Sequence, residues 1–310
     1  MSKSIAVNFF LVVLLGCNNL LNYRIQDIDS QVQYPEGPIW HEGNLFYVSY
    51  GQDKIFRRKE KTISVFWKNN ENPPKRCGPA SQIIRENRNL LVSCYDSNAL
   101  VEISPEGEKI HEYKLDGKKS HIGPNDFVKD KSGGIYFSVS GVFDEKAPAS
   151  GKILYLTKGD VIQEAIATNV FHYSNGLALS QDEKKILVSE HLRNRVIELD
   201  VIENGKLASP RVFSDLSRFP VKSNSLKLGP DGIKIGPKSG NIYVCQYGGS
   251  RILVLDEKGE LKKNIQLPIS FVTNLTFESQ NEKILYVTAE TNADSPTSAY
   301  NGRVYKLILD

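Results

Sequence analysis

The sequence predicts an all-β fold, a six-bladed β-propeller with a central metal site. Two observations predict the fold, and a third predicts the site. A short apolar strand pattern recurs six times, a second strand pattern follows each copy, and a polar residue stands at nearly the same distance before most copies. Such a repeat is typical of small antiparallel sheets arranged radially about a channel.

The first pattern is an apolar run that ends in a small polar or thiol residue. The runs are NLFYVS, NLLVS, GIYFS, KILVS, NIYVC and ILYVT, which end at Ser49, Ser93, Ser138, Ser189, Cys245 and Thr288. Their spacing of about 43 to 56 residues is the period of a four-stranded blade. Period-two alternation with β-branched and aromatic residues indicates strands. We expect these runs to be the innermost strands of the blades.

A second strand follows each run after a turn. These strands are KIFRR, ALVEI, KILYL, RVIEL, RILVL and RVYKL, and in most units a third stretch follows another turn. The last of them lies close to the C-terminus, so its blade lacks an outer strand. We expect residues 24–32 to supply that strand and close the ring, which gives one propeller domain over residues 24–310.

The third observation concerns polar residues thirteen or fourteen positions before the ends of five runs. They are Glu36, Asn125, Asn175, Asp231 and Asn274, and the second unit has Ala80 near this place. One repeat position from several blades converges at one mouth of the channel. Carboxylates and amides gathered there need partners, and a cation provides one. Oxygen ligands favour a hard divalent ion; calcium fits best, and manganese stays open.

For Asn175-Gly176 or Asp231-Gly232 taken alone, a simple turn is the alternative interpretation. Five matched positions favour a site. We therefore expect Glu36, Asn125, Asn175 and Asp231 to be metal ligands.

Residues 1–16 are interpreted as a signal peptide of the lipoprotein type. Lys3 precedes an apolar run that is too short to span a bilayer and ends in Leu-Leu-Gly-Cys. This ending predicts lipidation of Cys17; a plain secretory signal is the alternative. We expect an exported protein of the bacterial cell envelope, attached to the membrane through its lipid alone, with residues 17–23 as a tether.

Charge and cysteine content narrow the function classes. The 39 Lys and Arg are interspersed with 36 Asp and Glu, and no basic stripe is present, so nucleic acid is not an expected partner. At most one disulfide can form among Cys77, Cys94 and Cys245, and we expect Cys94 and Cys245 to be small buried hydrophobes. No CxxC, GxSxG or P-loop pattern occurs. We expect a monomer.

Five segments resemble successive blade motifs of the gluconolactonase and senescence-marker-protein family of propeller hydrolases. They are YPEGPIW, GPNDFVKDKSGGIYFS, SNGLALSQDEKKILVSE, GPDGIKIGPKSGNIYV and TNLTFESQNEKILYVT, in the family's order. The resemblance implies metal binding by Glu36, Asn175 and Asp231, with Asn125 as a ligand or substrate contact. It also implies hydrolysis of a lactone or related ester. The second unit, with CGPASQII, and the last, with TFES, depart from the pattern, which bears on substrate preference.

For a calcium-dependent lactonase or esterase, we expect Asp231 to position the attacking water or to take its proton. Asp126 is the alternative base, or a support for the cage. His121, His172 and Asn274 are expected substrate contacts, together with Asn125.

We expect His191, which follows one of the apolar runs, to lie at the opposite end of its blade in a structural role. Two other functions stay open. A non-catalytic surface propeller could use calcium only for stability while it binds a sugar, peptide or protein. A strictosidine-synthase-like enzyme shares the fold, but the Glu/Asn/Asn/Asp set argues against it.

Overall fold

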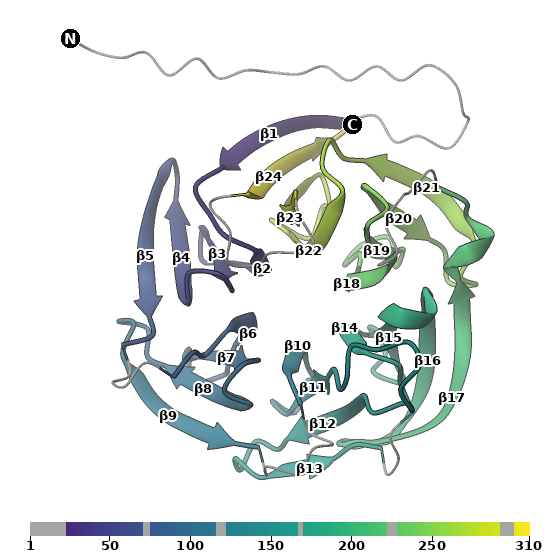
Figure 1. Ribbon diagram of the computed structural model, residues 1–310, viewed down its shortest axis with the longest axis horizontal. Coiled ribbons are helices and arrows are strands. Elements are labelled where there is room, and N and C mark those ends of the chain that lie inside the picture. The colour runs from purple at the N-terminus through teal and green to yellow at the C-terminus, as the bar shows by residue number, and fades with distance from the viewer. Residues whose placement is uncertain (1–22, 71–74, 116–121, 167–169, 222–227, 292–300) are drawn as a thin grey trace.

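The computed structural model describes residues 23–70, 75–115, 122–166, 170–221, 228–291 and 301–310. Within these ranges, 24 strands and two 3-10 turns form six four-stranded antiparallel blades around a central channel (Figure 1). The predicted six-bladed propeller is confirmed. Cys17, His121 and the predicted signal peptide lie outside the described residues.

The first three blades follow one another along the chain. Blade one contains β2 (Pro35–His41), β3 (Asn44–Ser49), β4 (Lys54–Lys59) and β5 (Thr62–Lys68). Blade two contains β6 (Pro79–Ile84), β7 (Leu90–Cys94), β8 (Ala99–Ile103) and β9 (Lys109–Lys114). Blade three contains β10 (Pro124–Lys129), β11 (Ile135–Val139), β12 (Lys152–Leu156) and β13 (Ile162–Glu164).

The last three blades complete the ring. Blade four contains β14 (Ser174–Leu179), β15 (Lys185–Glu190), β16 (Arg195–Glu203) and β17 (Lys206–Asp215), with the turns η1 (His191–Arg193) and η2 (Leu216–Arg218). Blade five contains β18 (Gly229–Ile235), β19 (Ile242–Tyr247), β20 (Arg251–Leu255) and β21 (Leu261–Gln266). Blade six contains β22 (Phe271–Phe277), β23 (Ile284–Glu290), β24 (Gly302–Leu309) and β1 (Tyr23–Asp29).

The ring is closed by the first and last strands of the described chain, as predicted. β1 pairs antiparallel with β24, with Arg24 opposite Ile308, and becomes the outermost strand of blade six. The strand before the first repeat therefore completes the last blade. This pairing covers the edge of β24 that would otherwise be exposed.

The expected position of the repeated apolar runs is wrong by one strand. The runs form β3, β7, β11, β15, β19 and β23, and in each blade another strand lies between the run and the channel (Figure 1). These innermost strands have sequences such as PEGPIWH and GPDGIKI. Their prolines, glycines and polar residues interrupt the alternation that marks a strand. The polar repeat position thus lies on the innermost strands themselves.

Each innermost strand contains a β-bulge at the level of the polar residues. Its register against the neighbouring strand shifts between Glu36 and Ile39 in blade one, and between Ser174 and Leu177 in blade four. The other four innermost strands shift at equivalent places. A bulge adds a residue and redirects the side chains around it. The polar residues reach the channel from these bulges.

Glycines after the polar residues allow successive blades to approach closely. A Cβ atom on Gly176 would lie 2.4 Å from the backbone oxygen of Asp231, and one on Gly232 would lie 2.3 Å from Asn274 Oδ1. Only glycine fits these places. The Asn-Gly and Asp-Gly pairs therefore reflect contact between blades, and the simple-turn interpretation is wrong.

The recurring small residue also links one blade to the next. Ser93 Oγ accepts a hydrogen bond from Ser81 N in its own blade at 2.8 Å and donates to the backbone oxygen of Asn125 in blade three at 2.5 Å. Ser138 makes the equivalent pair of bonds between blades three and four. These hydroxyls satisfy backbone groups that the bulges would leave buried without partners.

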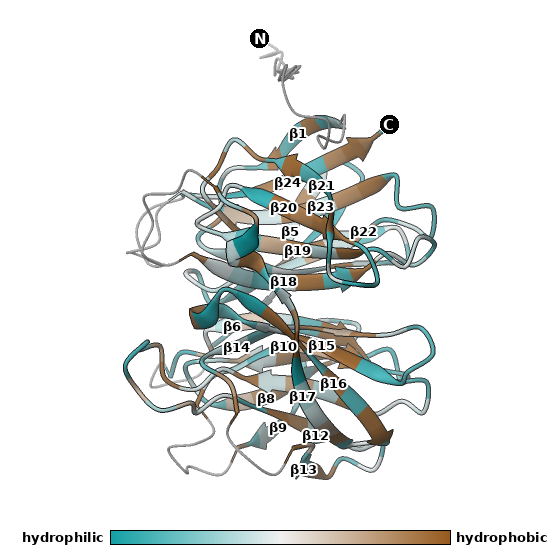
Figure 2. Cartoon of the chain, turned by 90° about the vertical axis from the view of Figure 1, so that its right-hand side faces the viewer, coloured by the Kyte–Doolittle hydropathy of each residue, from teal (hydrophilic) through white to brown (hydrophobic). Residues whose placement is uncertain are grey.

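The core consists of apolar side chains packed between neighbouring blades. Val48 and Ile55 of blade one, for example, pack with Val92 and Val101 of blade two. Figure 2 shows the hydrophobic segments within the strands and many hydrophilic segments at the loops. Among the described residues, no helix is long and apolar enough to cross a membrane.

Blade two carries a disulfide between Cys77 and Cys94, so the prediction that Cys94 is only a buried hydrophobe is wrong. The pairing of Pro79 with Cys94 between β6 and β7 brings Cys77, two residues earlier, to a Cα–Cα distance of 4.4 Å. The prediction failed because β6 was not recognised as a strand. Cys245 is buried and free, as expected.

We expect the double variant Cys77→Ala/Cys94→Ala to lose about 2–4 kcal/mol of the free energy of unfolding, because the crosslink restricts the unfolded chain. Urea unfolding with and without reductant measures this loss. Reductant should destabilise the wild type and Cys245→Ala, which keeps the crosslink, but not the double variant. Equal stability of oxidised and reduced wild type would contradict the prediction.

Candidate metal centre and active site

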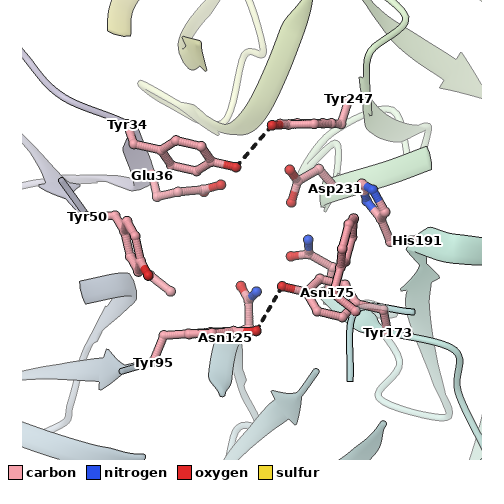
Figure 3. A pocket seen from close by; sticks show the side chains of 12 residues that line it. Tyr34, Glu36, Tyr50, Tyr95, Asn125, Tyr173, Asn175, His191, Asp231 and Tyr247 are labelled. Atoms are coloured by element: carbon pink, nitrogen blue, oxygen red, sulfur yellow. Dashed lines mark hydrogen bonds between the residues drawn. The ribbon is translucent and has the colours of Figure 1, made fainter. Parts of the chain in front are cut away.

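A cavity of about 300 Å³ opens at one mouth of the channel (Figure 3). Its walls combine acids, amides and aromatic rings from five of the six blades. The lining residues are Tyr34, Glu36, Tyr50, Ala80, Tyr95, Asn125, Phe143, Tyr173, Asn175, His191, Asp231 and Tyr247.

The four predicted ligands all lie at this cavity. Glu36, Asn125, Asn175 and Asp231 come from β2, β10, β14 and β18 and extend toward its centre (Figure 3). Ala80 of β6 lines the cavity on the side of blade two. Glu36 and Asp231 are only 8% and 4% exposed, so both acids are nearly removed from water. Metal binding by this set stays a prediction.

Burial raises the pKa of both carboxyl groups well above their ordinary values. For Glu36, the charge of Asp231 raises the pKa further, whereas hydrogen bonds from Gly37 N at 3.1 Å and from the Asn274 side chain lower it. For Asp231, the neighbouring charge that raises the pKa is Asp126. A cation between the two acids would relieve both the desolvation and the repulsion. The electrostatics therefore favour a positive charge in this cavity.

The two amides are arranged so that their oxygens are available. Asn125 Nδ2 donates to Ser140 Oγ at 3.2 Å. The Asn175 side chain hydrogen-bonds the carboxylate of Asp231, which accepts through its oxygens. Since both NH₂ groups donate hydrogen bonds, the amide oxygens can act as ligands of a cation.

The donor set fits a hard divalent ion. Two carboxylates balance its charge, and two amide oxygens add ligands of the kind that calcium accepts in irregular cages. In the described part of the chain, no group of three or more His, Cys, Asp or Glu side chains is arranged to hold a metal ion. The amide oxygens would therefore be indispensable to the site.

Tyrosine pairs form the walls of the cavity. Tyr34 OH donates to Tyr247 OH at 3.2 Å, and the hydroxyls of Tyr95 and Tyr173 lie 3.1 Å apart (Figure 3). Burial raises the pKa of all four phenols above the ordinary value, so they stay protonated at neutral pH. Because Tyr34 donates within its pair, Tyr247 keeps its own hydroxyl hydrogen for a bound molecule.

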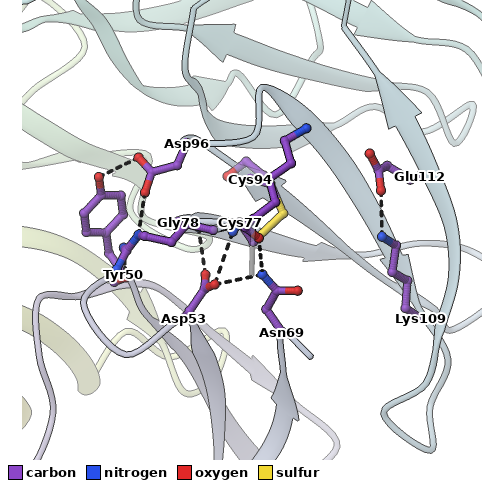
Figure 4. Close-up of a disulfide and its surroundings, with 12 residues drawn as sticks. Tyr50, Asp53, Asn69, Cys77, Gly78, Cys94, Asp96, Lys109 and Glu112 are labelled. Carbon is purple, nitrogen blue, oxygen red and sulfur yellow. Dashed lines mark hydrogen bonds and ion pairs between the residues drawn. A yellow bond between two sulfur atoms is a disulfide. The ribbon is translucent and has the colours of Figure 1, made fainter. Parts of the chain in front are cut away.

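The wall near blade two is fixed by the region around the disulfide (Figure 4). Tyr50 OH donates to Asp96 Oδ1 at 2.7 Å, and Arg76 Nε donates to Asp96 Oδ2 at 2.8 Å. The guanidinium of Arg76 also lies over the Tyr50 ring. The disulfide ties the segment that carries Arg76 to the end of β7, directly before Tyr95. It thereby positions two of the cavity tyrosines.

His191 lines the cavity, which corrects the expectation that it lies at the opposite end of its blade. β15 runs antiparallel to β14, so its last residue, Glu190, pairs with Ser174 beside Asn175, and His191 follows directly. His191 Nδ1 lies 3.2 Å from the backbone oxygen of Pro230. Because a carbonyl oxygen only accepts, this contact requires the proton on Nδ1.

Two expected substrate contacts lie outside the cavity lining. Asn274 on β22 is buried, hydrogen-bonds Glu36 through its side chain, and accepts from Leu275 N at 2.9 Å. It orients the acid. His172 lies at the surface, where its ring is close to Arg193.

Asp126 is 2% exposed and is not part of the lining either. Its carboxylate accepts hydrogen bonds from Ser81 Oγ at 2.8 Å and from Leu177 N at 3.3 Å, and it pairs with Lys234 at 3.0 Å. The geometry therefore favours Asp231, not Asp126, as the group that meets a substrate.

The aromatic walls and His191 were not predicted as part of the site, although the sequence carries a signal for them. Tyr95, His191 and Tyr247 each stand two residues after the small residue that ends an apolar run. Tyr34 and Tyr173 stand two residues before Glu36 and Asn175. These offsets place them at the same mouth as the polar positions.

We expect Glu36→Gln to gain stability relative to wild type as the pH rises, in the presence of a chelator. The raised pKa of Glu36 means that the metal-free fold holds a proton more tightly than the unfolded chain does. This contribution is complete below the ordinary carboxyl pKa of about 4 and is lost as the pH rises toward the native value. Urea unfolding of both proteins between pH 4.5 and 7.5 tests this. A stability difference that does not change with pH would contradict it.

The repeats, their order and the cavity at the channel mouth define a six-bladed propeller with its candidate site on the channel axis. Residues 34–291 match the family described as SMP-30/Gluconolactonase/LRE-like region, and the chain belongs to this family.

One relative is similar to the chain in sequence, and two solved structures are similar to it in fold. The chain is similar to lactonase drp35 of Staphylococcus epidermidis, with 27% identity over 235 residues that cover 73% of this chain and 67% of that protein. Its fold is similar to a gluconolactonase of Xanthomonas campestris, with a TM-score of 0.72 at 20% identity over 94% and 91% of the two chains. It is also similar to the calcium-binding protein regucalcin of Agrobacterium tumefaciens, with a TM-score of 0.73 at 15% identity over 94% and 96%.

Proposed function

We propose that this chain is a metal-dependent hydrolase that opens a lactone or a related ester, with calcium as its ion. The observation that supports this most is the convergence of two buried carboxylates and two amides on one cavity. Membership of the family supports a hydrolase, since one relative is named a lactonase and one structural neighbour a gluconolactonase. The neighbour named as a calcium-binding protein supports the choice of ion.

Glu36, Asn125, Asn175 and Asp231 would hold the ion. Once bound, a calcium-type ion polarises the carbonyl of a lactone as a Lewis acid. Glu36, oriented by Asn274, chiefly balances charge. The amide oxygens of Asn125 and Asn175 complete the cage without further negative charge.

Asp231 takes the proton from the attacking water. The water oxygen bonds to the carbonyl carbon, the ring C–O bond breaks, and the proton passes to the leaving oxygen, so the product is a hydroxy acid. Asp231 suits this role because it lines the cavity, whereas the oxygens of Asp126 are held by Ser81, Leu177 and Lys234. Tyr247 is placed to donate a hydrogen bond to a substrate oxygen.

The walls favour an uncharged substrate. The cavity lining among the described residues contains five tyrosines and Phe143 but no Lys or Arg. A flat ring can stack on such aromatic faces, and the rings exclude water from the reacting bond. A neutral lactone or ester fits these walls better than an anionic substrate would.

We expect Asp231→Asn and Glu36→Gln to lose hydrolysis for different reasons. Each removes one negative charge from the cage, so both should bind calcium more weakly. At saturating calcium, Asp231→Asn should stay slower by about 10²–10⁴-fold, as is typical when a general base is lost, whereas Glu36→Gln should recover much of its rate. Lactone hydrolysis against calcium concentration, with metal occupancy followed in parallel, distinguishes the two.

Full recovery of Asp231→Asn at saturation would remove Asp231 as the base. Asn274→Ala is a useful companion because it should resemble Glu36→Gln if it acts by orienting Glu36. Absence of hydrolysis by wild type over a panel of lactones and esters, at any calcium level, would favour the non-catalytic binding propeller.

We also propose that the protein is exported and carries a lipid anchor at Cys17, which the Leu-Leu-Gly-Cys ending of the predicted signal peptide supports. We expect wild type to enter the detergent phase and to carry an acyl mass at its N-terminus. Cys17→Ser should be soluble and unmodified, with unchanged hydrolysis. Equal partitioning of both proteins, without an acyl mass on either, would show that the anchor is wrong.

A further inference from the structure

A third carboxylate lies inside the ring, next to the candidate ligands. Asp126 follows Asn125 on β10, at the place where blades one, four and five have Gly37, Gly176 and Gly232. Its side chain is 3% exposed. Two neutral donors reach it, Ser81 Oγ and Leu177 N, but neither cancels its charge.

The charge is met by a lysine from another blade. Lys234 Nζ lies 3.0 Å from Asp126 Oδ2, and the side chain of Lys234 is 26% exposed. Lys234 stands on β18 of blade five, three residues after Asp231, whereas Asp126 belongs to blade three. Blade four lies between these two blades in the ring (Figure 1). The ion pair therefore connects two blades that are not neighbours.

The pair is electrostatically coupled to the candidate ligands. The charge of Asp126 raises the pKa of both Glu36 and Asp231. Burial raises the pKa of the Cys245 thiol, the charges of Asp231, Glu36 and Asp126 raise it further, and Lys234 lowers it. These four charges therefore interact in a part of the interior where water screens them poorly. Three carboxylates and one ammonium leave two net negative charges, which match a divalent ion.

We propose that Lys234 is a positioning residue that acts as the internal counter-ion of the channel: it holds Asp126 away from the metal cage and sets the affinity of the cage for a divalent cation. The inference rests on the proposed metal site. In this role Lys234 does not contact the substrate. Its ion pair also explains why Asp126 acts neither as a ligand nor as a base.

Removal of each charge separately, and of both together, tests this inference. Calcium binding is measured by titration calorimetry on chelator-treated wild type, Lys234→Met, Asp126→Asn and the double variant. Asp126→Asn leaves the ammonium uncompensated, so calcium should bind at least about tenfold more weakly. Lys234→Met leaves the carboxylate uncompensated, so calcium should bind at least about tenfold more tightly. The double variant restores the net charge and should lie within about threefold of wild type.

The two single variants should therefore change calcium affinity in opposite directions. If the pair were purely structural, both single variants would bind calcium more weakly than wild type, and the double variant would bind it more weakly still. Lys234→Arg is the matched control, which keeps the charge and should bind as wild type does. Single-variant shifts of the same sign, or a double variant that is not restored, would overturn the inference. If Lys234→Met does not fold, the comparison of Asp126→Asn with the double variant decides. A wild type that binds no calcium would instead refute the metal site itself.

Discussion

The β-bulge in each innermost strand is the feature on which both the ring and its site depend. A regular strand would send adjacent side chains to opposite faces, whereas the bulge between Pro124 and Phe127 lets Asn125 and Asp126 both reach the interior. The bulge also interrupts the backbone ladder, and Ser138 Oγ accepts the hydrogen bond of Asp126 N while it donates to the backbone oxygen of Asn175 in the next blade. A change at such a serine would therefore disturb two blades and the ligand that the bulge presents.

The parts of the structure that follow from the repeat could be predicted from the sequence, and those that depend on the innermost strands could not. Period and offset were enough to find six blades, their closure by residues 24–32, and the polar residues that meet at one mouth. The innermost strands are short and rich in Pro and Gly, so they were missed. The apolar runs were taken for the innermost strands, so each blade was predicted one strand out of position. Because neighbouring strands are antiparallel, His191 was then placed at the wrong end of its blade. The Cys77–Cys94 disulfide was missed for the same reason.

Charged and aromatic side chains are divided between the cavity and its surroundings. Aromatic rings and protonated phenols line the cavity together with Glu36 and Asp231, whereas the Lys234–Asp126 pair lies outside its lining. Removing carboxylates from water is unfavourable unless a positive charge accompanies them. One of the three acids obtains that charge from Lys234, while among the described residues Glu36 and Asp231 are met by hydrogen-bond donors without a positive charge. Among the described residues, this division leaves the two cavity carboxylates without a compensating positive charge.

The six equivalent positions around the channel carry different side chains, so the cavity is not the same on all sides. Blades one, three, four and five present oxygen-bearing side chains, and Asn274 of blade six turns to Glu36. Blade two presents only the methyl group of Ala80, which cannot bind a cation. On that side Tyr50 and Tyr95 form the wall, and the disulfide and Asp96 fix it. The departure of blade two from the family pattern thus leaves this position without an oxygen atom, and the candidate ligands come from the other blades.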